Sequence, residues 1–452
     1  MVATTPCAAT PDRKATPMLV PPLALAQFVA SYAATTMTVA VSVLAADLGT
    51  TVLGVQTAIT LFTLTMATLM VPGGKLTDVL GRKRCFVAGL AVYGAGALLA
   101  SAAHGPVALV LGYSLLQGIG SALMIPPIYI LVTVASPDVE TRARRFGVVS
   151  GAGALGAAAG PLLGGLITTW LGWRSSFLLQ VLIVGVIVLL ALRIAEPPET
   201  PARTPFDVGG AVLSAAGLFF VVAGVLRPAW LLIGLGAAIL VAFHFHIRAR
   251  ERGGREPLVS PALFRDRVTR LGLITQHVQW LMLQGSFFVI AVFLQQARGY
   301  DAVETGLTLT PATIGILAAS AAAGRMARRH AQRRLIRGGF VLAIAGLLLV
   351  LLLVRADSGV ASAVPGLFLL GAGVGIMLTA SVNLVQSRSP DAAQGDISGV
   401  SRGVSNLGSS VGTALAGSVL AGAAGHGFAL ALATMTAAGV IGLIAAVLLP
   451  AR

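Results

Sequence analysis

The stretch Gly74-Lys-Leu-Thr-Asp-Val-Leu-Gly-Arg-Lys-Arg84 separates two long apolar runs early in the chain. Lys75, Arg82, Lys83 and Arg84 give it a dense positive charge, and charged side chains are costly in hydrocarbon. The stretch therefore has to lie at a membrane surface. Its excess of Lys and Arg predicts the cytoplasmic surface, because loops on that side carry most of the positive charge in membrane proteins. We expect a short polar hairpin that joins two membrane spans.

The composition of the whole chain indicates an integral membrane protein. Of 452 residues, 56% are hydrophobic and 10% are charged, whereas about a quarter of the residues are charged in soluble domains. The net charge of +15 is spread over short segments between apolar runs. It therefore predicts contact with anionic membrane lipids and not with nucleic acid.

Nothing in the sequence indicates a cofactor or a metal. Cys7 and Cys85 form neither a disulfide framework nor a metal site. The chain has no phosphate-binding loop of the ATPase type and no HExxH or CxxC motif. We expect a protein without a metal that is not an enzyme. An enzyme within the membrane would need a converging acid and base pair.

Fourteen apolar segments are each long enough to cross a bilayer, which takes about 20 residues. They are residues 18–46, 52–72, 85–103, 106–134, 146–170, 175–193, 208–226, 229–247, 270–295, 304–323, 339–355, 364–387, 397–424 and 427–449. With a cytoplasmic N-terminus, only Arg174, Arg227, Arg298 and Arg355 of the 31 Lys and Arg residues fall outside. This bias predicts a multi-pass protein of the plasma (inner) membrane with both termini in the cytoplasm.

The spans form two groups of six with an extra pair between them. We expect a disordered cytoplasmic tail at 1–17, an N-terminal six-helix bundle at 18–194, a linker at 195–267 that contains the extra pair and a basic cytoplasmic segment, and a C-terminal six-helix bundle at 268–452. Prolines in residues 195–205 disfavour helix there. The basic residues from Arg248 to Arg270 predict an interfacial helix.

The charged stretch resembles the loop signature of the major facilitator superfamily, Gly-x-Leu-x-Asp-x-x-Gly-Arg-Lys-x. The matching residues are Gly74, Leu76, Asp78, Gly81, Arg82 and Lys83. The layout of six, two and six spans is similar to the fourteen-span drug–proton antiporter branch, as are Gln295 to Tyr300 and Gly306 to Pro311. The resemblance covers the chain from about Leu23 onward.

The resemblance implies the all-α major facilitator fold and a secondary transporter that works by alternating access. Its substrates would be hydrophobic or amphipathic small molecules, such as drugs, antibiotics or metabolites, and its coupling ion would be the proton. We expect a monomer surrounded by membrane lipids. In the family the charged loop is thought to hold the cytoplasmic ends together. The matched residues Gly74, Asp78, Gly81, Arg82 and Lys83 would then form a conformational latch, with Asp78 facing the start of another span near Ser398.

A second motif lies in the span at 146–170. Gly156, Gly160 and Gly164 are spaced by four residues, so one helix face is bare backbone that a neighbour can approach closely. Pro161 removes a backbone hydrogen bond and bends the helix. Together with Gly165, these residues resemble a signature of exporters in the superfamily. Ordinary packing of small residues is the alternative interpretation.

The sequence also departs from the family pattern at two positions. The family's motif in the fourth span has an arginine, implicated in proton handling, where this chain has Ser114. The drug-exporting branch has an aspartate in the first span where this chain has Ala33. All 16 Asp and Glu residues fall in predicted loops or at span ends. An acid-free interior disfavours a dicationic substrate and favours a neutral, amphipathic or anionic one.

One titratable residue is predicted deep in a span. His277 lies ~10 Å along the span at 270–295, and histidine titrates near neutral pH. It either bonds to a neighbouring helix as a neutral imidazole or binds substrate and carries the proton. Further candidates for a central site are Gln276, Gln279 and Gln284 on the same span, with Tyr32, Gln27, Tyr113, Ser114, Gln117, Asn383 and Gln386 on others. Arg402 either faces the same cavity or lies among lipid headgroups.

Two alternatives to proton-driven drug export remain open at this point. The first is an exporter of lipids or amphipaths, or a facilitator, without tight proton coupling. The second is a transporter-like sensor or scaffold, which would bind its ligand without moving it across the membrane.

Overall fold

A computed structural model describes residues 19–136, 139–194, 206–327, 329–354, 359–387, 394–422 and 426–450. Within these ranges all regular secondary structure is helical. The first part of the chain forms α1 (Val20–Thr36), a 3-10 turn (Met37–Ala40), α2 (Val41–Asp47), α3 (Val52–Leu80), α4 (Arg82–Ser101), α5 (Pro106–Leu109), a π-helical stretch (Val110–Gln117), α6 (Gly118–Val134), α7 (Val139–Leu171) and α8 (Trp173–Leu192). The predicted tail at 1–17 lies outside the described residues.

The second part begins with an inserted pair, α9 (Val208–Leu226) and α10 (Trp230–Arg252). It continues with a 3-10 turn (Pro261–Phe264), α11 (Arg267–Arg298), α12 (Ala302–Met326), α13 (Gln332–Leu353), a 3-10 turn (Val360–Ser362), α14 (Val364–Gln386), α15 (Gln394–Gly422) and α16 (Gly427–Val447).

The helices correspond one by one to the predicted spans. When α1 and α2 count as one helix and α5 and α6 as another, 13 helices in the described ranges are long and apolar enough to cross a membrane. The helix α15 coincides with the last but one of the predicted spans, but its serines together with Asp396 and Arg402 make it more polar than these 13 helices. The prediction of an all-α membrane fold is confirmed.

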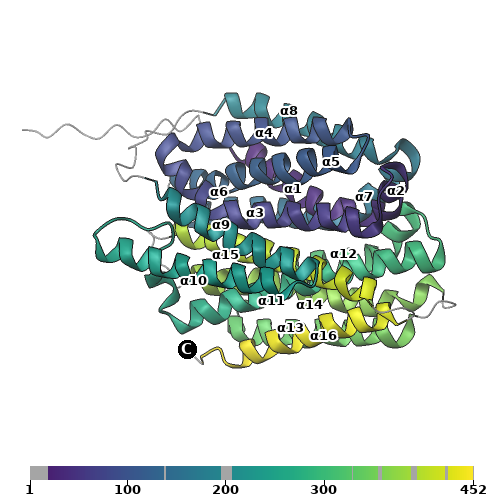
Figure 1. Cartoon of the computed structure of the whole chain (residues 1–452). Helices are drawn as coiled ribbons and strands as arrows, with labels where there is room; N and C mark the ends of the chain where they lie inside the picture. Colours follow the sequence, from purple (N-terminus) through teal and green to yellow (C-terminus); the bar gives the residue numbers. More distant parts are fainter. Residues whose placement is uncertain are drawn as a thin grey trace, which may run out of the picture.

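The helices gather into two halves, as Figure 1 shows. Helices α1 to α8 lie on one side of the view, and α11 to α16 lie on the other. The halves meet along a contact surface that we call the seam, where α3 packs against α15 and α7 packs against α12. The inserted pair packs against both halves at the seam, because α9 contacts both α3 and α15.

The charged stretch at 74–84 is mostly helical, so the prediction of a polar hairpin of that length is wrong. Helix α3 continues to Leu80 and α4 begins at Arg82. Only Gly81 lies between them, and its φ of 97° is a conformation that favours glycine. The helix extends beyond its apolar run because polar residues at its end can remain helical outside hydrocarbon.

The predicted interfacial helix from Arg248 to Arg270 is also wrong. Helix α10 ends at Arg252, and α11 begins only at Arg267. Gly253 and Gly254 end the helix, and Gly254 has a φ of 66°. Glycine ends helices readily because it adopts this left-handed conformation at no steric cost.

A buried carboxylate joins the two inserted helices. Asp207, whose side chain is 3% exposed, caps α9 by accepting a hydrogen bond from the Gly210 N–H at 3.0 Å. It also accepts from the Leu258 N–H at 3.1 Å, and it lies 2.9 Å from His246 Nε2 and 3.4 Å from Arg250 Nε. Burial alone would raise the pKa of Asp207, but the hydrogen bonds and the Arg250 charge outweigh burial and lower that pKa.

The Asp207→Asn variant should unfold at a lower temperature than the wild type at neutral pH. Because the folded state has the lower pKa, the carboxylate stabilises the protein above about pH 4 and this contribution is lost as pH falls further. Thermal unfolding in detergent between acid and neutral pH measures the difference. Asp301→Asn, at an exposed helix cap, is the matched control. Parallel pH profiles for the wild type and Asp207→Asn would contradict the assignment.

Candidate functional site

The glycine motif of α7 packs against α1 in its own half. A methyl group built on Gly156 would overlap the Phe28 carbonyl oxygen. Methyl groups on Gly160 and Gly164 would overlap the hydroxyls of Thr35 and Thr36 in the same way. The absence of side chains at these positions is therefore what allows α1 and α7 to approach so closely.

The same motif also reaches across the seam to α12. A methyl group on Gly165 would overlap the Ala302 carbonyl, and one on Gly306 would overlap the Pro161 carbonyl. The Thr313 hydroxyl adds a hydrogen bond of 2.8 Å to the Ala158 carbonyl. The motif thus lies at the seam, with one face on each neighbour.

Glutamine side chains bridge the two halves at three places. Gln56 Nε2 on α3 donates to the Thr413 carbonyl of α15 at 2.7 Å. Gln284 Nε2 on α11 donates to the Ala34 carbonyl of α1 at 3.0 Å. Gln295 donates to the Val39 carbonyl at 2.7 Å and accepts from the Ser42 N–H at 3.0 Å.

Sequence reasoning named Gln284 but missed Gln56 and Gln295. Gln295 supplies hydrogen bonds where the helix narrows to the 3-10 turn between α1 and α2. The available signal was a long amide side chain inside an apolar run, because such a group in hydrocarbon needs a partner within the protein.

Two further glutamines of α11 have amide N–H groups without a described acceptor. The Gln276 amide oxygen accepts from Ser401 at 2.6 Å, and the Gln279 amide oxygen accepts from Ser381 at 3.2 Å. Both side chains are fully buried, and neither amide nitrogen has a partner among the described residues. These groups therefore present N–H donors without acceptors.

His277 lies half-buried between α11 and α15. Its Nδ1 is 3.3 Å from the Val404 carbonyl oxygen. A carbonyl oxygen only accepts, so Nδ1 carries the hydrogen and the neutral ring has its lone pair on Nε2. Within the described residues nothing bonds to Nε2, and this atom would take the second proton.

Four candidates from the first half bond within that half. The Tyr32 hydroxyl lies 2.6 Å from Ser176 Oγ. The other three bonds join Tyr113 to the Ala33 carbonyl at 3.2 Å, Ser114 to the Ala58 carbonyl at 2.7 Å, and Gln117 to Gln180 at 2.9 Å. All four side chains are buried. They therefore tie helices of one half together in this conformation.

The last candidates of the central site divide into two kinds. Gln27 joins a chain of hydrogen bonds, because its amide oxygen accepts from the Tyr129 hydroxyl at 3.3 Å and Tyr129 accepts from Arg402. Arg402 thus reaches across the seam from α15 to α6. On α14, Asn383 is exposed and Gln386 is half-buried.

The C-terminal end of α3 meets the other half through Lys75. Its ammonium lies 3.1 Å from the Asp396 carboxylate at the start of α15 and 2.7 Å from Glu256. Lys83, from the predicted latch, donates to the Ile194 carbonyl at 2.7 Å within its own half. The side chain of Asp78 lies outside the described residues, and the latch remains a prediction.

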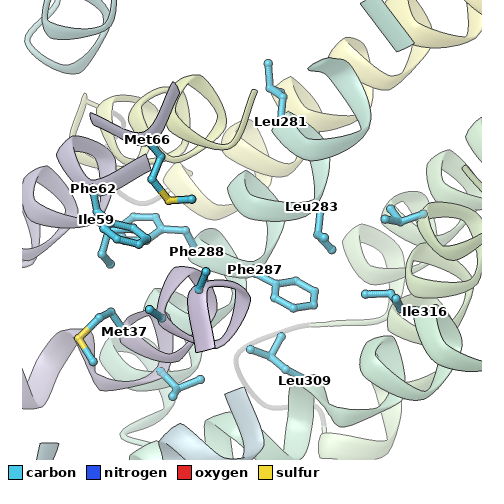
Figure 2. Close-up of a cluster of buried hydrophobic side chains, with 14 of the residues drawn as sticks. Met37, Ile59, Phe62, Met66, Leu281, Leu283, Phe287, Phe288, Leu309 and Ile316 are labelled. Carbon is cyan, nitrogen blue, oxygen red and sulfur yellow. The ribbon is translucent and has the colours of Figure 1, made fainter. Parts of the chain in front are cut away.

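An apolar layer occupies the middle of the seam. Figure 2 shows Ile59, Phe62 and Met66 meeting Phe288, while Phe287 faces Leu309 and Ile316. These side chains come from α3 in the first half and from α11 and α12 in the second. Each is at most 4% exposed. The seam is therefore filled by flexible and aromatic side chains.

The described residues hold no cluster of three His, Cys, Asp or Glu side chains that could bind a metal ion. The run Gly399-Val-Ser-Arg-Gly403 has the spacing of a hydrolase nucleophile motif. It lies inside the continuous helix α15, whereas that motif requires a sharp turn from a strand to a helix.

Two helical halves in contact along a partly polar seam are the architecture of a polytopic membrane transporter. The model of the Major Facilitator Superfamily matches residues 23–413. The chain therefore belongs to the major facilitator superfamily, as its charged stretch predicted.

Several curated relatives are named for the transport or export of a particular compound or for resistance to it. The chain is 32% identical over 406 residues to a probable actinorhodin transporter of Streptomyces coelicolor, covering 86% of this chain and 70% of that protein. It is 29% identical to a tetracenomycin C resistance and export protein of Streptomyces glaucescens, covering 84% and 72%. It is 30% identical to a puromycin resistance protein of Streptomyces alboniger, covering 83% and 76%.

The Gly156→Val variant should lower the free energy of unfolding by about 1–3 kcal/mol. It should also reduce transport, because the added side chain forces α1 and α7 apart. Gly151→Val on the same helix is the matched control, since nothing described lies within 4 Å of a methyl group built there. Thermal unfolding and flux of the purified variants measure both effects. Equal behaviour of the two variants would contradict the packing role of the motif.

Proposed function

We propose that the protein exports hydrophobic small molecules from the cytoplasm by alternating access, coupled to proton exchange. The apolar layer of the seam carries this proposal. Methionine and aromatic side chains such as Met66, Phe62 and Phe288 repack around ligands of different shape. The antibiotic transport and resistance named for its relatives supports the same substrate class.

In this proposal the two halves rock about the seam, with the substrate near the bilayer midplane. The close glycine contacts of α7 would form the surface along which the helices of the two halves move relative to each other. Hydrogen bonds across the seam, such as those of Gln56, Gln284 and Gln295, would break and form again as each end opens. The latch of Gly74, Asp78, Gly81, Arg82 and Lys83, beside the Lys75 ion pairs, would hold the cytoplasmic ends closed. Both termini would lie in the cytoplasm of a cell with this protein in its plasma membrane.

His277 is the proposed proton carrier. Its Nε2 is open within the described residues, while Nδ1 is fixed by the Val404 carbonyl. The described carboxylates offer no alternative, because each lies in a loop or within three residues of a helix end. Histidine can bind and release a proton at the pH of the cell.

An exporter of amphipaths or a facilitator without tight proton coupling is the second candidate. The acid-free interior favours it, together with Ala33 and Ser114 at positions where the resembling branch has an aspartate and an arginine. A sensor or scaffold would bind a ligand without flux. Purified protein in vesicles, with and without an imposed pH gradient, separates these three functions. Coupled exchange predicts faster substrate uptake into vesicles that are acidic inside, facilitation predicts no effect of the gradient, and a sensor gives no uptake.

The His277→Ala variant should lose the acceleration by the pH gradient, and its transport rate should fall by about 10² or more. His244→Ala, at an exposed position on α10, is the matched control. Flux in vesicles and thermal unfolding in detergent distinguish lost transport from lost folding. Wild-type transport by His277→Ala at every pH would refute the role of this residue.

A further inference from the structure

Arg402 is a charged residue inside the seam. It lies eight residues beyond Gln394, the first residue of α15, so it is ~12 Å along that helix. Its guanidinium lies 5.0 Å from the centre of the Tyr129 ring and donates a hydrogen bond to the Tyr129 hydroxyl. Tyr129 belongs to α6 in the other half, so Arg402 points into the seam and not toward the lipid headgroups.

No carboxylate among the described residues forms an ion pair with Arg402, although Lys75, Arg174 and Arg250 each pair with a carboxylate in that part of the chain. A guanidinium has five N–H donors, and within the described residues only the Tyr129 hydroxyl accepts from it. Arg402 is half-buried, and a cation inside a membrane protein without a counter-ion is costly and is usually retained for function. Arg402 therefore has both charge and donors available to a ligand.

The surroundings of Arg402 supply donors and an apolar surface. The neighbouring Ser401 bonds to Gln276 of α11, whose amide nitrogen is buried without a described partner. The ring of Phe146 lies 5.6 Å from that of Tyr129. A positive charge and unpaired N–H groups beside aromatic rings suit an anion attached to an apolar body.

We infer that Arg402 binds the carboxylate or phenolate of a small organic anion in the seam, and that such anions are the preferred substrates. This inference rests on the proposed export function and names its substrate class. The anion would replace solvent around the guanidinium and make charge-assisted hydrogen bonds with it. Cationic compounds would meet Arg402 without a carboxylate to offset the repulsion.

Two dyes that share a xanthene ring test this inference: anionic fluorescein and cationic tetramethylrhodamine methyl ester. Their binding to the purified protein is measured by fluorescence anisotropy, and their uptake is measured in vesicles of phosphatidylcholine, which contain no anionic lipid. The wild type should bind and transport fluorescein in preference to the rhodamine. Arg402→Gln should weaken fluorescein binding by about 10- to 100-fold and leave rhodamine binding within about twofold. Arg402→Lys should retain the preference, because it keeps the positive charge.

Arg267→Gln is the matched control, because it removes an equal charge from an exposed position at the start of α11. Thermal unfolding of each variant verifies that it is folded. A preference of the wild type for the rhodamine, an equal loss of both dyes in Arg402→Gln, or unchanged fluorescein binding in that variant would overturn the inference. Binding of fluorescein that depends on Arg402 but occurs without flux would refute export and support the anion site. Flux of both dyes without charge preference would support export and overturn the anion site.

Discussion

Hydrocarbon offers no partner to a polar group, and this constraint governs the whole molecule. It forces the backbone into helices, and it requires each polar side chain inside the membrane to find a partner in the protein. The Gln56 and Gln295 amides satisfy this requirement by bonding to backbone carbonyls of the opposite half. Glycines such as Gly156 and Gly165 let the helices approach closely enough for backbone to touch backbone. The halves are thus held by a few hydrogen bonds and by close packing, which are contacts that can exchange between two arrangements.

The seam has an unequal supply of polar groups, and this imbalance connects structure with function. The Gln276 and Gln279 amides of α11 retain N–H donors and Arg402 adds a positive charge to the seam, while every described carboxylate lies in a loop or within three residues of a helix end. Apolar side chains such as Phe62, Phe287 and Phe288 form a further part of the contact between the halves (Figure 2). A site of this kind suits a largely apolar compound that carries an acceptor or a negative charge. The same scarcity of carboxylates leaves His277 as the proposed carrier of protons.

The fold could be predicted from the sequence because the length of an apolar run and the distribution of charge are local properties. Helix ends were less predictable, since α3 remains helical past its apolar run to Leu80 and the glycines after Arg252 divide the basic segment. The central site was only partly predictable, because a hydrogen-bond partner depends on which helices pack together. Tyr113 and Ser114 are polar and deep, yet they bond within their own half, whereas Arg402 reaches the opposite half. Sequence alone does not show whether a side chain faces its own half or the opposite half.

The central claim is that the two halves rock about the seam, so that one end opens as the other closes. Spin labels on Val107 and Ala297 report the separation of the halves at one end, and labels on Leu80 and Arg325 report it at the other, all four positions being exposed. Double electron–electron resonance in lipid nanodiscs measures both distances with and without substrate and across pH. The account predicts that one distance lengthens while the other shortens. Distances that stay fixed under every condition, or that lengthen together, would contradict it.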